Sequence, residues 1–477
     1  MRPAGRREEA LEHPEIAETA YTDAGIPSGL PHRRHEKLFG TDGIRGVAND
    51  TLTPELALAV GRAAAQVLGG GTFLLGRDTR VSGPMLEAAL VAGLCSAGAR
   101  VLRAGILPTP AVAYLVGEVR ANAGVVVSAS HNPIEDNGIK FFGPDGRKLP
   151  DSVEERVEAV LAEDGPRPTG VDVGGVEDFP EAQELYLRHL LRHGLPVRGL
   201  RVVVDCAFGA AYRLAPRLWE ALGASVVALH AEPDGSRINV GCGSTHPAVL
   251  QQAVVQHRAH VGFAHDGDAD RVVAVDECGA VVDGDLILAA CARHLYARGE
   301  LDPPVVVVTV MTNLGVERTL QREGIRVERA PVGDRYVLER MEELGAVLGG
   351  EQSGHVIFRH LATTGDGLLT ALQLVRVMQE SGRSLAELVA GIPRYPQVLV
   401  NVPVRSRQRL LQDPAVRQRV ELAHRALGND GRVLVRASGT EPVVRVMVEH
   451  EDADRARTIA DELAAFLRDK DDGPGGP

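Results

Sequence analysis

Four loops of the 477-residue chain carry residues that could perform chemistry, and the first surrounds Ser130. The apolar run GVVV precedes SASHNP at residues 128–133, so its hydroxyls should lie at the carboxyl end of a strand, where open parallel sheets bind ligands. Ser130, beside His131 and near Lys140, could act as a nucleophile. Taken alone, such a segment is more often a turn in which Ser and Asn cap their own backbone.

The second loop, DGDADR at residues 266–271, places three carboxylates at alternate positions. Asp266, Asp268 and Asp270 should repel one another, and a hard cation such as Mg²⁺ would remove that cost. Arg271, directly after them, suits a phosphate beside the ion. A solvated acidic turn is the alternative; an EF-hand is not expected because an aliphatic strand, VVAV at residues 272–275, takes the place of the second half of the loop.

The third loop, GGEQSGHVIF at residues 349–358, offers a carboxylate, a hydroxyl and an imidazole between glycines. Glu351, Ser353 and His355 together suit the recognition of a polyol. The segment TTGDG at 363–367 follows and should open an amphipathic helix. An ordinary turn is the more common interpretation of this loop taken alone.

The fourth loop, RASGTEPVVR at residues 436–445, has the composition of a phosphate-binding nest. Ser438, Gly439 and Thr440 can offer hydroxyls and backbone N–H groups, and Arg436 and Arg445 flank them. The alternative is a hairpin loop with two surface arginines.

Together, these loops supply the parts needed to move a phosphoryl group on a sugar phosphate. Phosphoryl transfer requires mainly positioning and charge neutralisation from a protein. The chain has a formal net charge of -12, so an anionic substrate needs local positive charge. We expect this positive charge to come from the cation together with Arg45, Lys140, Arg335, Arg436 and Arg445.

The lysines are few: Lys37, Lys140, Lys148 and Lys470 are the lysines among 52 basic residues. A GC-rich genome would favour arginine codons, but a retained lysine can also mark a site that needs a titratable ammonium. Lys140 fits the second interpretation because of its place near Ser130. Lys148, nearby, is expected to be a surface residue.

The composition argues against several other classes of protein. Aromatic residues make up 4% of an acidic chain, which is unfavourable for nucleic-acid binding. No stretch approaches the ~18 consecutive apolar residues of a membrane span, and residues 1–36, which lack an apolar run of ~7–15 residues, are not expected to be a secretory signal. Five scattered cysteines without a CxxC motif indicate a reducing cytoplasm rather than disulfides or a zinc site.

An α/β fold should position these loops, because strand-like apolar runs alternate with helix-like segments. The runs at 71–80, 200–211 and 303–315 share one layout and suggest three related α/β domains. Alternating strands at 397–404, 431–438 and 443–450 predict a small C-terminal α+β domain with one solvent-facing side. The expected domains are 37–192, 193–293, 294–393 and 394–470, with disordered ends at 1–36 and 471–477.

The motifs resemble those of the α-D-phosphohexomutase superfamily, especially its branch that acts on glucosamine phosphates. They follow the superfamily's order within residues 38–468: LFGTDGIRG at 38–46, SASHNP at 128–133, DGDADR at 266–271, VGDRYV at 332–337, GGEQSGH at 349–355 and RASGTEP at 436–442. The resemblance implies three tandem related α/β domains with mixed sheets around a central cleft, plus a smaller C-terminal α+β domain. His265 and the N-terminal extension depart from the commonest pattern.

The resemblance also implies a mechanism. Ser130 would be a phosphoserine that donates its phosphoryl group to the sugar, giving a bound 1,6-bisphosphate that reorients and returns its other phosphate. One Mg²⁺ per chain would bind Ser130 and the three aspartates. Lys140, with Arg45 as electrostatic support and His131 alongside, would serve proton transfer. Further residues would bind the sugar phosphate (Arg271, Arg335, Glu351, Ser353, His355) and the distal phosphate (Arg436, Ser438, Gly439, Thr440, Arg445).

The implied activity interconverts glucosamine 6-phosphate and glucosamine 1-phosphate in the cytoplasm, feeding UDP-N-acetylglucosamine and cell-wall peptidoglycan precursors. Glucosamine 1,6-bisphosphate would be the intermediate or activator. Two alternatives stay open: a phosphomannomutase/phosphoglucomutase of the same superfamily, and a non-catalytic sugar-phosphate sensor. A small-molecule sugar phosphate is the expected partner, without nucleic acid or membrane. The sequence leaves open whether the chain forms a homodimer and whether a kinase first phosphorylates Ser130.

Overall fold

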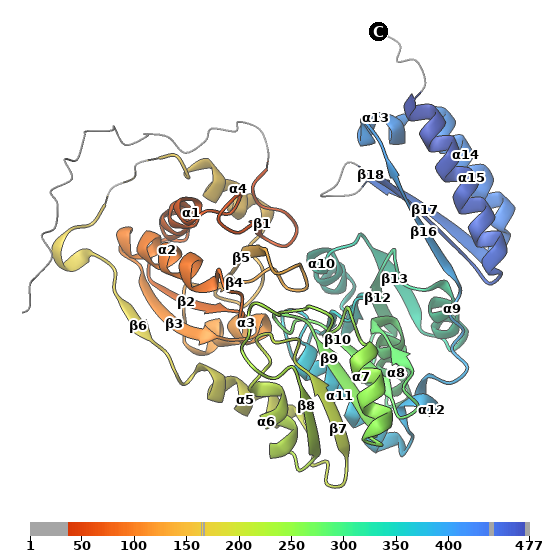
Figure 1. Cartoon of the computed structure of the whole chain (residues 1–477), viewed down its shortest axis with the longest axis horizontal. Helices are drawn as coiled ribbons and strands as arrows, with labels where there is room; N and C mark the ends of the chain where they lie inside the picture. The colour runs from red at the N-terminus through yellow and green to blue at the C-terminus, as the bar shows by residue number, and fades with distance from the viewer. Residues whose placement is uncertain (1–36, 164, 166, 438–442, 473–477) are drawn as a thin grey trace, which may run out of the picture. The chain divides into compact units, whose positions relative to one another are not determined.

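The computed structural model describes residues 37–163, 165, 167–437 and 443–472 (Figure 1). The predicted disordered extension at 1–36 lies outside these residues, as do Ser438, Gly439 and Thr440 of the predicted phosphate nest. Within the described ranges, no helix combines the length and apolar character needed to cross a membrane.

The first sheet is mixed and has the strand order β1-β5-β4-β2-β3-β6. Parallel pairs join β2 to β3 and β4, whereas β5 runs antiparallel to β4 and β1. Its strands are β1 Ile44–Val47, β2 Thr72–Arg77, β3 Arg100–Ile106, β4 Ala123–Val127, β5 Asp136–Phe142 and β6 Val176–Asp178. Its helices are α1 Pro54–Val67, α2 Gly83–Ser96, α3 Thr109–Glu118, α4 Asp151–Ala159 and α5 Ala182–His193.

The second and third sheets are also mixed, with the orders β11-β10-β9-β7-β8 and β13-β12-β14-β15. The second contains β7 Arg201–Asp205, β8 Ser225–Leu229, β9 Val261–His265, β10 Val272–Asp276 and β11 Val281–Val282, with helices α6 Leu214–Ala221 and α7 Ala248–Gln256. The third contains β12 Val305–Thr309, β13 Arg326–Ala330, β14 Leu348–Gly350 and β15 Val356–Phe358, with α8 Gly284–Ala297, α9 Leu314–Arg322, α10 Asp334–Leu344, α11 Gly367–Ser381 and α12 Leu385–Val389.

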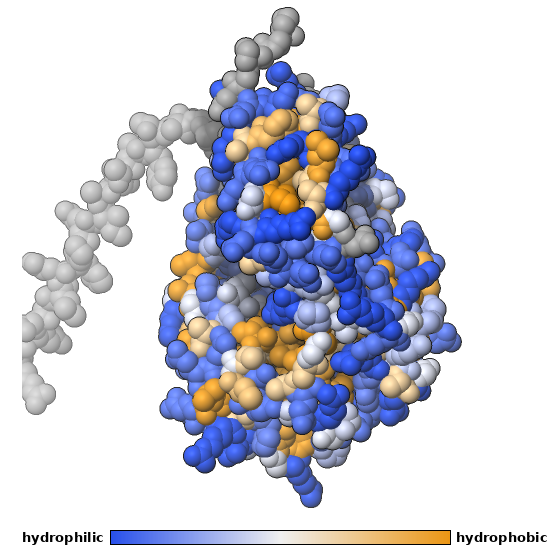
Figure 2. Space-filling model, turned by 90° about the vertical axis from the view of Figure 1, so that its right-hand side faces the viewer, coloured by the Kyte–Doolittle hydropathy of each residue, from blue (hydrophilic) through white to orange (hydrophobic). Residues whose placement is uncertain are grey.

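The C-terminal sheet is antiparallel, with β18 between β16 and β17. Its elements are β16 Gln397–Pro403, α13 Arg407–Gln412, α14 Pro414–Leu427, β17 Gly431–Ala437, β18 Val443–His450 and α15 Ala453–Asp472. Val398 is 7% exposed and its neighbour Leu399 is 52% exposed, so one side of the sheet faces solvent. Figure 2 shows hydrophobic residues in separate places among hydrophilic ones on one face of the molecule.

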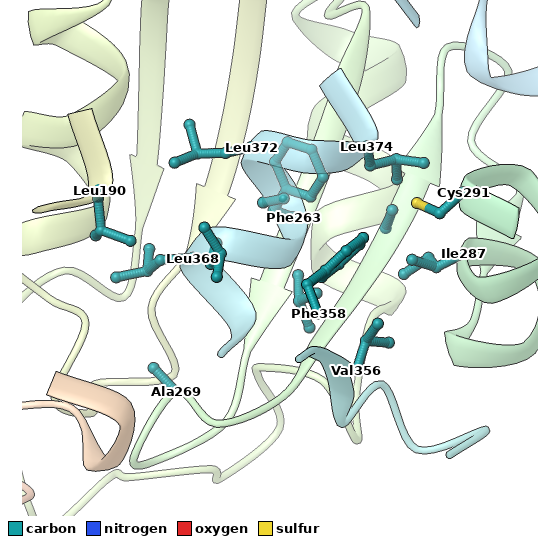
Figure 3. Close-up of a cluster of buried hydrophobic side chains, with 14 of the residues drawn as sticks. Leu190, Phe263, Ala269, Ile287, Cys291, Val356, Phe358, Leu368, Leu372 and Leu374 are labelled. Carbon is teal, nitrogen blue, oxygen red and sulfur yellow. The ribbon is translucent and has the colours of Figure 1, made fainter. Parts of the chain in front are cut away.

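One hydrophobic core contains residues of the first three sheets. Helix α11, which is buried along most of its length, belongs to this core. Leu368, Leu372 and Leu374 of α11 lie among Phe263 of β9 and Phe358 of β15 (Figure 3). The C-terminal sheet has a separate core of its own. The predicted three α/β domains with mixed sheets and a smaller C-terminal domain are therefore confirmed, whereas their exact limits stay predictions.

Candidate active site

The loop around Ser130, residues 128–135 (the serine loop), follows the end of β4. Pro133 within it cannot donate to a strand ladder, which keeps this segment out of the sheet. Ser130 is 1% exposed and adopts a left-handed conformation with φ +54°. Its Oγ donates a hydrogen bond to Asp266 Oδ2 at 2.5 Å and lies 3.3 Å from His131 Nδ1. The predicted nucleophile thus lies against the predicted carboxylate cluster, although the two are far apart in the sequence.

The carboxylate cluster occupies the turn between β9 and β10. Oxygen atoms of Asp266, Asp268 and Asp270 lie within 4.8 Å of one another, and the three side chains are buried. Lys140 of β5 reaches them: its Nζ is 2.8 Å from Asp268 Oδ2 and 3.8 Å from Asp270 Oδ2. Thr109, at the start of α3, donates to Asp268 Oδ2 at 2.6 Å.

These residues fit a hard divalent cation. Asp268 Oδ1 and Asp270 Oδ1 are buried and have no hydrogen-bond partner among the residues that the structure describes. Burial, together with the two neighbouring carboxylates, raises the pKa of Asp266 well above its ordinary value. An all-oxygen donor set with unsatisfied oxygens and excess negative charge is what Mg²⁺ binds.

The charge states of the neighbouring groups follow from the same cluster. Burial opposes the charge of Lys140, but Asp268 and Asp270 outweigh it and raise the pKa of this lysine. Burial, reinforced by the nearby arginines, lowers the pKa of His131 to about 4. At neutral pH the site therefore holds a lysine ammonium and a neutral His131 imidazole.

Arg45 also reaches the serine loop. Its Nη1 donates to Asn132 Oδ1 at 3.2 Å, and its Nη2 lies 3.5 Å from Asp42 Oδ2. Behind the aspartates, His265 is fully buried, and burial lowers its pKa to about 4. The unusual residue at this position is thus a neutral core side chain.

The third loop, residues 349–358 (the sugar loop), lies beside this cluster and forms one wall of a cavity of about 410 Å³. Glu351 Oε1 accepts from the backbone N–H of Gly333 at 3.1 Å, and Ser353 Oγ donates to Glu351 Oε2 at 3.3 Å. Arg271 lines the same cavity and lies 3.8 Å from Asp270 Oδ1. Other lining residues include Ser244, Thr245, Asp283, Thr309, Met311 and Gln352.

His355 lies on the inner side of this loop. The side chain is buried, its Nε2 accepts from the backbone N–H of Gly365 at 2.9 Å, and its nitrogens lie 3.6 Å from Asp270 and Asp334. This geometry suits a residue that holds the two carboxylates in place.

Arg335 and Lys148 take places that the sequence did not indicate. Arg335 pairs with Asp151 and Glu154 of α4, and the distance from its Nη2 to Glu154 Oε1 is 3.0 Å. Lys148 was expected at the surface, but its side chain is 11% exposed and pairs with two aspartates, Asp42 at 3.1 Å and Asp334 at 2.7 Å. That expectation was wrong. Two carboxylates beside the ammonium offset the free-energy cost of burying its charge.

The C-terminal domain contributes two arginines that face each other across a strand pair. Arg436 of β17 is in register with Arg445 of β18. Burial, together with the charge of Arg445, lowers the pKa of Arg436. Like charges in register cost free energy, and a bound anion would offset that cost.

Models of four domains of one family match the chain in order. They are described as phosphoglucomutase/phosphomannomutase alpha/beta/alpha domain I over residues 36–167, domain II over 184–279, domain III over 283–395 and the C-terminal domain over 399–466.

Individual relatives agree with these matches. The chain is 56% identical over 431 residues to the phosphoglucosamine mutase of Moorella thermoacetica, covering 89% of this chain and 97% of that protein. It is 53% identical over 442 residues to the phosphoglucosamine mutase of Desulforudis audaxviator, covering 91% and 98%. Among solved structures, a phosphoglucomutase/phosphomannomutase family protein from Burkholderia thailandensis has a TM-score of 0.77 at 26% identity, covering 92% of this chain and 98% of that one.

Proposed function

The chain belongs to the phosphoglucomutase/phosphomannomutase family, and we propose that it is a phosphoglucosamine mutase, an isomerase that interconverts glucosamine 6-phosphate and glucosamine 1-phosphate. The observation that carries the proposal is the contact of Ser130 Oγ with Asp266, inside a triad of buried carboxylates that also binds Lys140. The curated relatives of the same branch support glucosamine phosphate as the substrate.

In the reaction, Ser130 carries the phosphoryl group. A sugar hydroxyl oxygen forms a bond to phosphorus while the bond from phosphorus to Ser130 Oγ breaks, so the hydroxyl loses one proton and Oγ gains one. The resulting glucosamine 1,6-bisphosphate turns around, and its other phosphate returns to Ser130. We assign the proton movements to Lys140 and to His131, which lies beside Oγ, and the support of negative charge to Arg45.

The aspartate triad and Ser130 would hold one Mg²⁺ per chain. When bound, the ion supplies positive charge that stabilises the phosphoryl group during transfer.

Substrate recognition is divided between two parts of the chain. Glu351 and Ser353 would hydrogen-bond sugar hydroxyls and Arg271 would bind a phosphate, and their place on the wall of one cavity supports these roles. Arg436 and Arg445 would bind the distal phosphate together with Ser438, Gly439 and Thr440. Arg335 and His355 would act indirectly, through the carboxylates they contact.

The cytoplasm is the expected compartment, since all five cysteines are free thiols in the described chain. There, glucosamine 1-phosphate would feed the synthesis of UDP-N-acetylglucosamine and cell-wall precursors.

The test is kcat/KM of the Mg²⁺-loaded, phosphorylated protein on glucosamine, glucose and mannose phosphates, measured side by side. A preference for glucosamine of about tenfold or more, which corresponds to roughly 1.4 kcal/mol of transition-state discrimination, supports the proposal. A preference for glucose or mannose would instead identify a phosphoglucomutase or phosphomannomutase. No turnover of any of the three, with phosphate on Ser130 verified by mass, would favour the sensor.

A further inference from the structure

Ser130 is held in a conformation that a serine rarely adopts. Its left-handed backbone, φ +54°, is uncommon for a residue with a side chain, so the surrounding structure must stabilise it. Hydrogen bonds reach Ser130 from both sides: Ser128 Oγ accepts from its N–H at 2.9 Å, and two side chains donate to its carbonyl oxygen.

The first of these donors is Arg80, which is fully buried. Its Nη2 donates to the carbonyl oxygens of Ser130 at 3.0 Å and Asn132 at 2.8 Å, and its Nη1 donates to those of Pro133 and Asp136. Its charge is balanced by Asp78, whose Oδ2 accepts from Arg80 Nε at 3.0 Å. Both terminal nitrogens of the guanidinium therefore bind backbone carbonyl groups within residues 130–136, while Nε binds Asp78.

Asp78 also fixes Ser128, the residue that binds the backbone N–H of Ser130. Its Oδ2 accepts from Ser128 Oγ at 2.7 Å, and Ser128 in turn accepts from the Ser130 N–H. One buried carboxylate therefore fixes both the arginine that binds the Ser130 carbonyl and the serine that binds the Ser130 amide.

The second donor, Asn239, comes from the second sheet's domain. Its Nδ2 donates to the Ser130 carbonyl oxygen at 2.8 Å, and the residue is 8% exposed. Its own loop is fixed by Asp205, which accepts from the backbone N–H groups of Ala207 and Gly243, each at 2.9 Å, and lies 2.9 Å from His230 Nδ1. Asn239 is thus a fixed donor and not a freely rotating surface amide.

We propose that Arg80 and Asn239 are positioning residues that hold Ser130 in its left-handed conformation, so that Oγ faces Asp266 in both half-reactions. This inference rests on the proposed mutase function, in which the phosphoryl group must leave and return to the same place. The two residues act through the backbone of Ser130 and not by contact with the substrate.

The test compares the parent protein with Asn239→Asp, which keeps the side-chain shape but replaces the N–H donor with an oxygen facing the carbonyl. Asn401→Asp, at an exposed position of β16, is the matched control. Two quantities are measured: the rate at which Ser130 accepts a phosphoryl group from glucose 1,6-bisphosphate, by intact mass, and kcat and KM per folded, phosphorylated enzyme.

We expect Asn239→Asp to slow Ser130 phosphorylation and to lower kcat, each by at least about tenfold, because the buried Ser130 carbonyl loses one of its two side-chain donors and faces a carboxylate oxygen instead. KM should stay within about threefold, since substrate contacts are unchanged. Asn401→Asp should match the parent in every measurement. A purely structural role would lower the melting temperature and the folded fraction without changing kcat per phosphorylated molecule.

The outcomes separate this inference from the proposed function. If the parent accepts phosphate on Ser130 and Asn239→Asp does so at the same rate and with the same kcat, the positioning role of Asn239 is overturned while the function stands. If the parent accepts no phosphate on Ser130, the proposed function fails and this inference falls with it. Should Asn239→Asp prove unstable, Asn239→Ala, which removes the donor without adding a charge, is measured in the same way and judged by the same criteria.

Discussion

Lys140 occupies a position where size and charge are both constrained. The side chain is 2% exposed, and its ammonium lies between Asp268 and Asp270. A guanidinium is larger, planar and effectively never deprotonated, so it can replace the charge but not the compact proton carrier. We expect Lys140→Arg to lower kcat by about 100-fold or more, within the range typical of lost acid–base catalysis, with the fold preserved.

Lys37→Arg serves as the control for this prediction, because Lys37 is an exposed lysine whose Nζ lies 3.5 Å from Glu155. It should retain parental kcat. Turnover of Lys140→Arg close to that of the parent would show that only the charge of Lys140 matters.

The buried aspartates lead to a second prediction at the same scale. Asp268→Asn removes one anionic metal ligand. Lys140 and Thr109 both donate to Asp268 Oδ2, so an amide NH2 group in that place would face two donors. Mg²⁺ affinity, measured by calorimetry, should fall by about tenfold or more, as expected when a ligand charge is lost. Asp234→Asn, at a half-buried position outside the triad, should bind Mg²⁺ as the parent does, and equal affinity in both variants would argue against the triad as the metal site.

Residue types and local spacing singled out Ser130, the three aspartates and Glu351 as candidates, and the structure brings Ser130 into contact with Asp266. The partners of Lys148, Arg335 and Asn239 could not be predicted, because each contacts residues from distant parts of the chain. Arg80 lies three residues beyond the end of β2, and its place in the sequence does not say which carbonyl groups it binds.

At the scale of a single element, α11 begins at an unusual carboxylate. Asp366 is its N-cap, accepting from Leu369 N–H at 2.9 Å and from the Tyr186 hydroxyl at 2.5 Å. Burial raises the pKa of Asp366 from 3.8 to about 6. Between these values the unfolded chain loses its proton while the folded protein keeps it, so the stability contributed by Asp366 falls as pH rises through this window.

Asp366→Asn keeps the cap and removes this titration. Relative to the parent, the variant should therefore gain about 2 kcal/mol between pH 4.5 and pH 7, seen as a larger increase in melting temperature at the higher pH. Asp413→Asn, at the more exposed N-cap of α14, is the matched control. A pH-independent difference for Asp366→Asn would mean that Asp366 is already ionised at pH 4.5.

The strands were the easiest elements to predict. The runs at 71–80, 200–211 and 303–315 contain β2, β7 and β12, since a buried strand needs continuous β-branched and apolar residues. The short strands β6 and β11 carry too few residues for such a signal, and their places depend on the neighbours with which they pair.

At the scale of the whole molecule, the C-terminal domain combines its own core with a small set of polar contacts to the third domain. Glu449 accepts from the backbone N–H of Leu314 at 2.7 Å, at the start of α9, and from Arg432 Nε at 2.6 Å. Arg432 also donates to the carbonyl oxygen of Thr312. A domain joined in this way can rotate as a body, because its core does not have to be opened.

We therefore expect the C-terminal domain to close when Arg436 and its neighbours bind the distal phosphate. The protein for the test is Ser130→Ala, which cannot take up a phosphoryl group, and the ligand is glucose 1,6-bisphosphate. Its radius of gyration in solution scattering should fall on binding. Adding Arg436→Ala should abolish the decrease while Mg²⁺ binding at the aspartate triad is unaffected. An unchanged radius in Ser130→Ala at saturating ligand would mean that the phosphate binds without domain closure, and that the pair of arginines in register serves affinity alone.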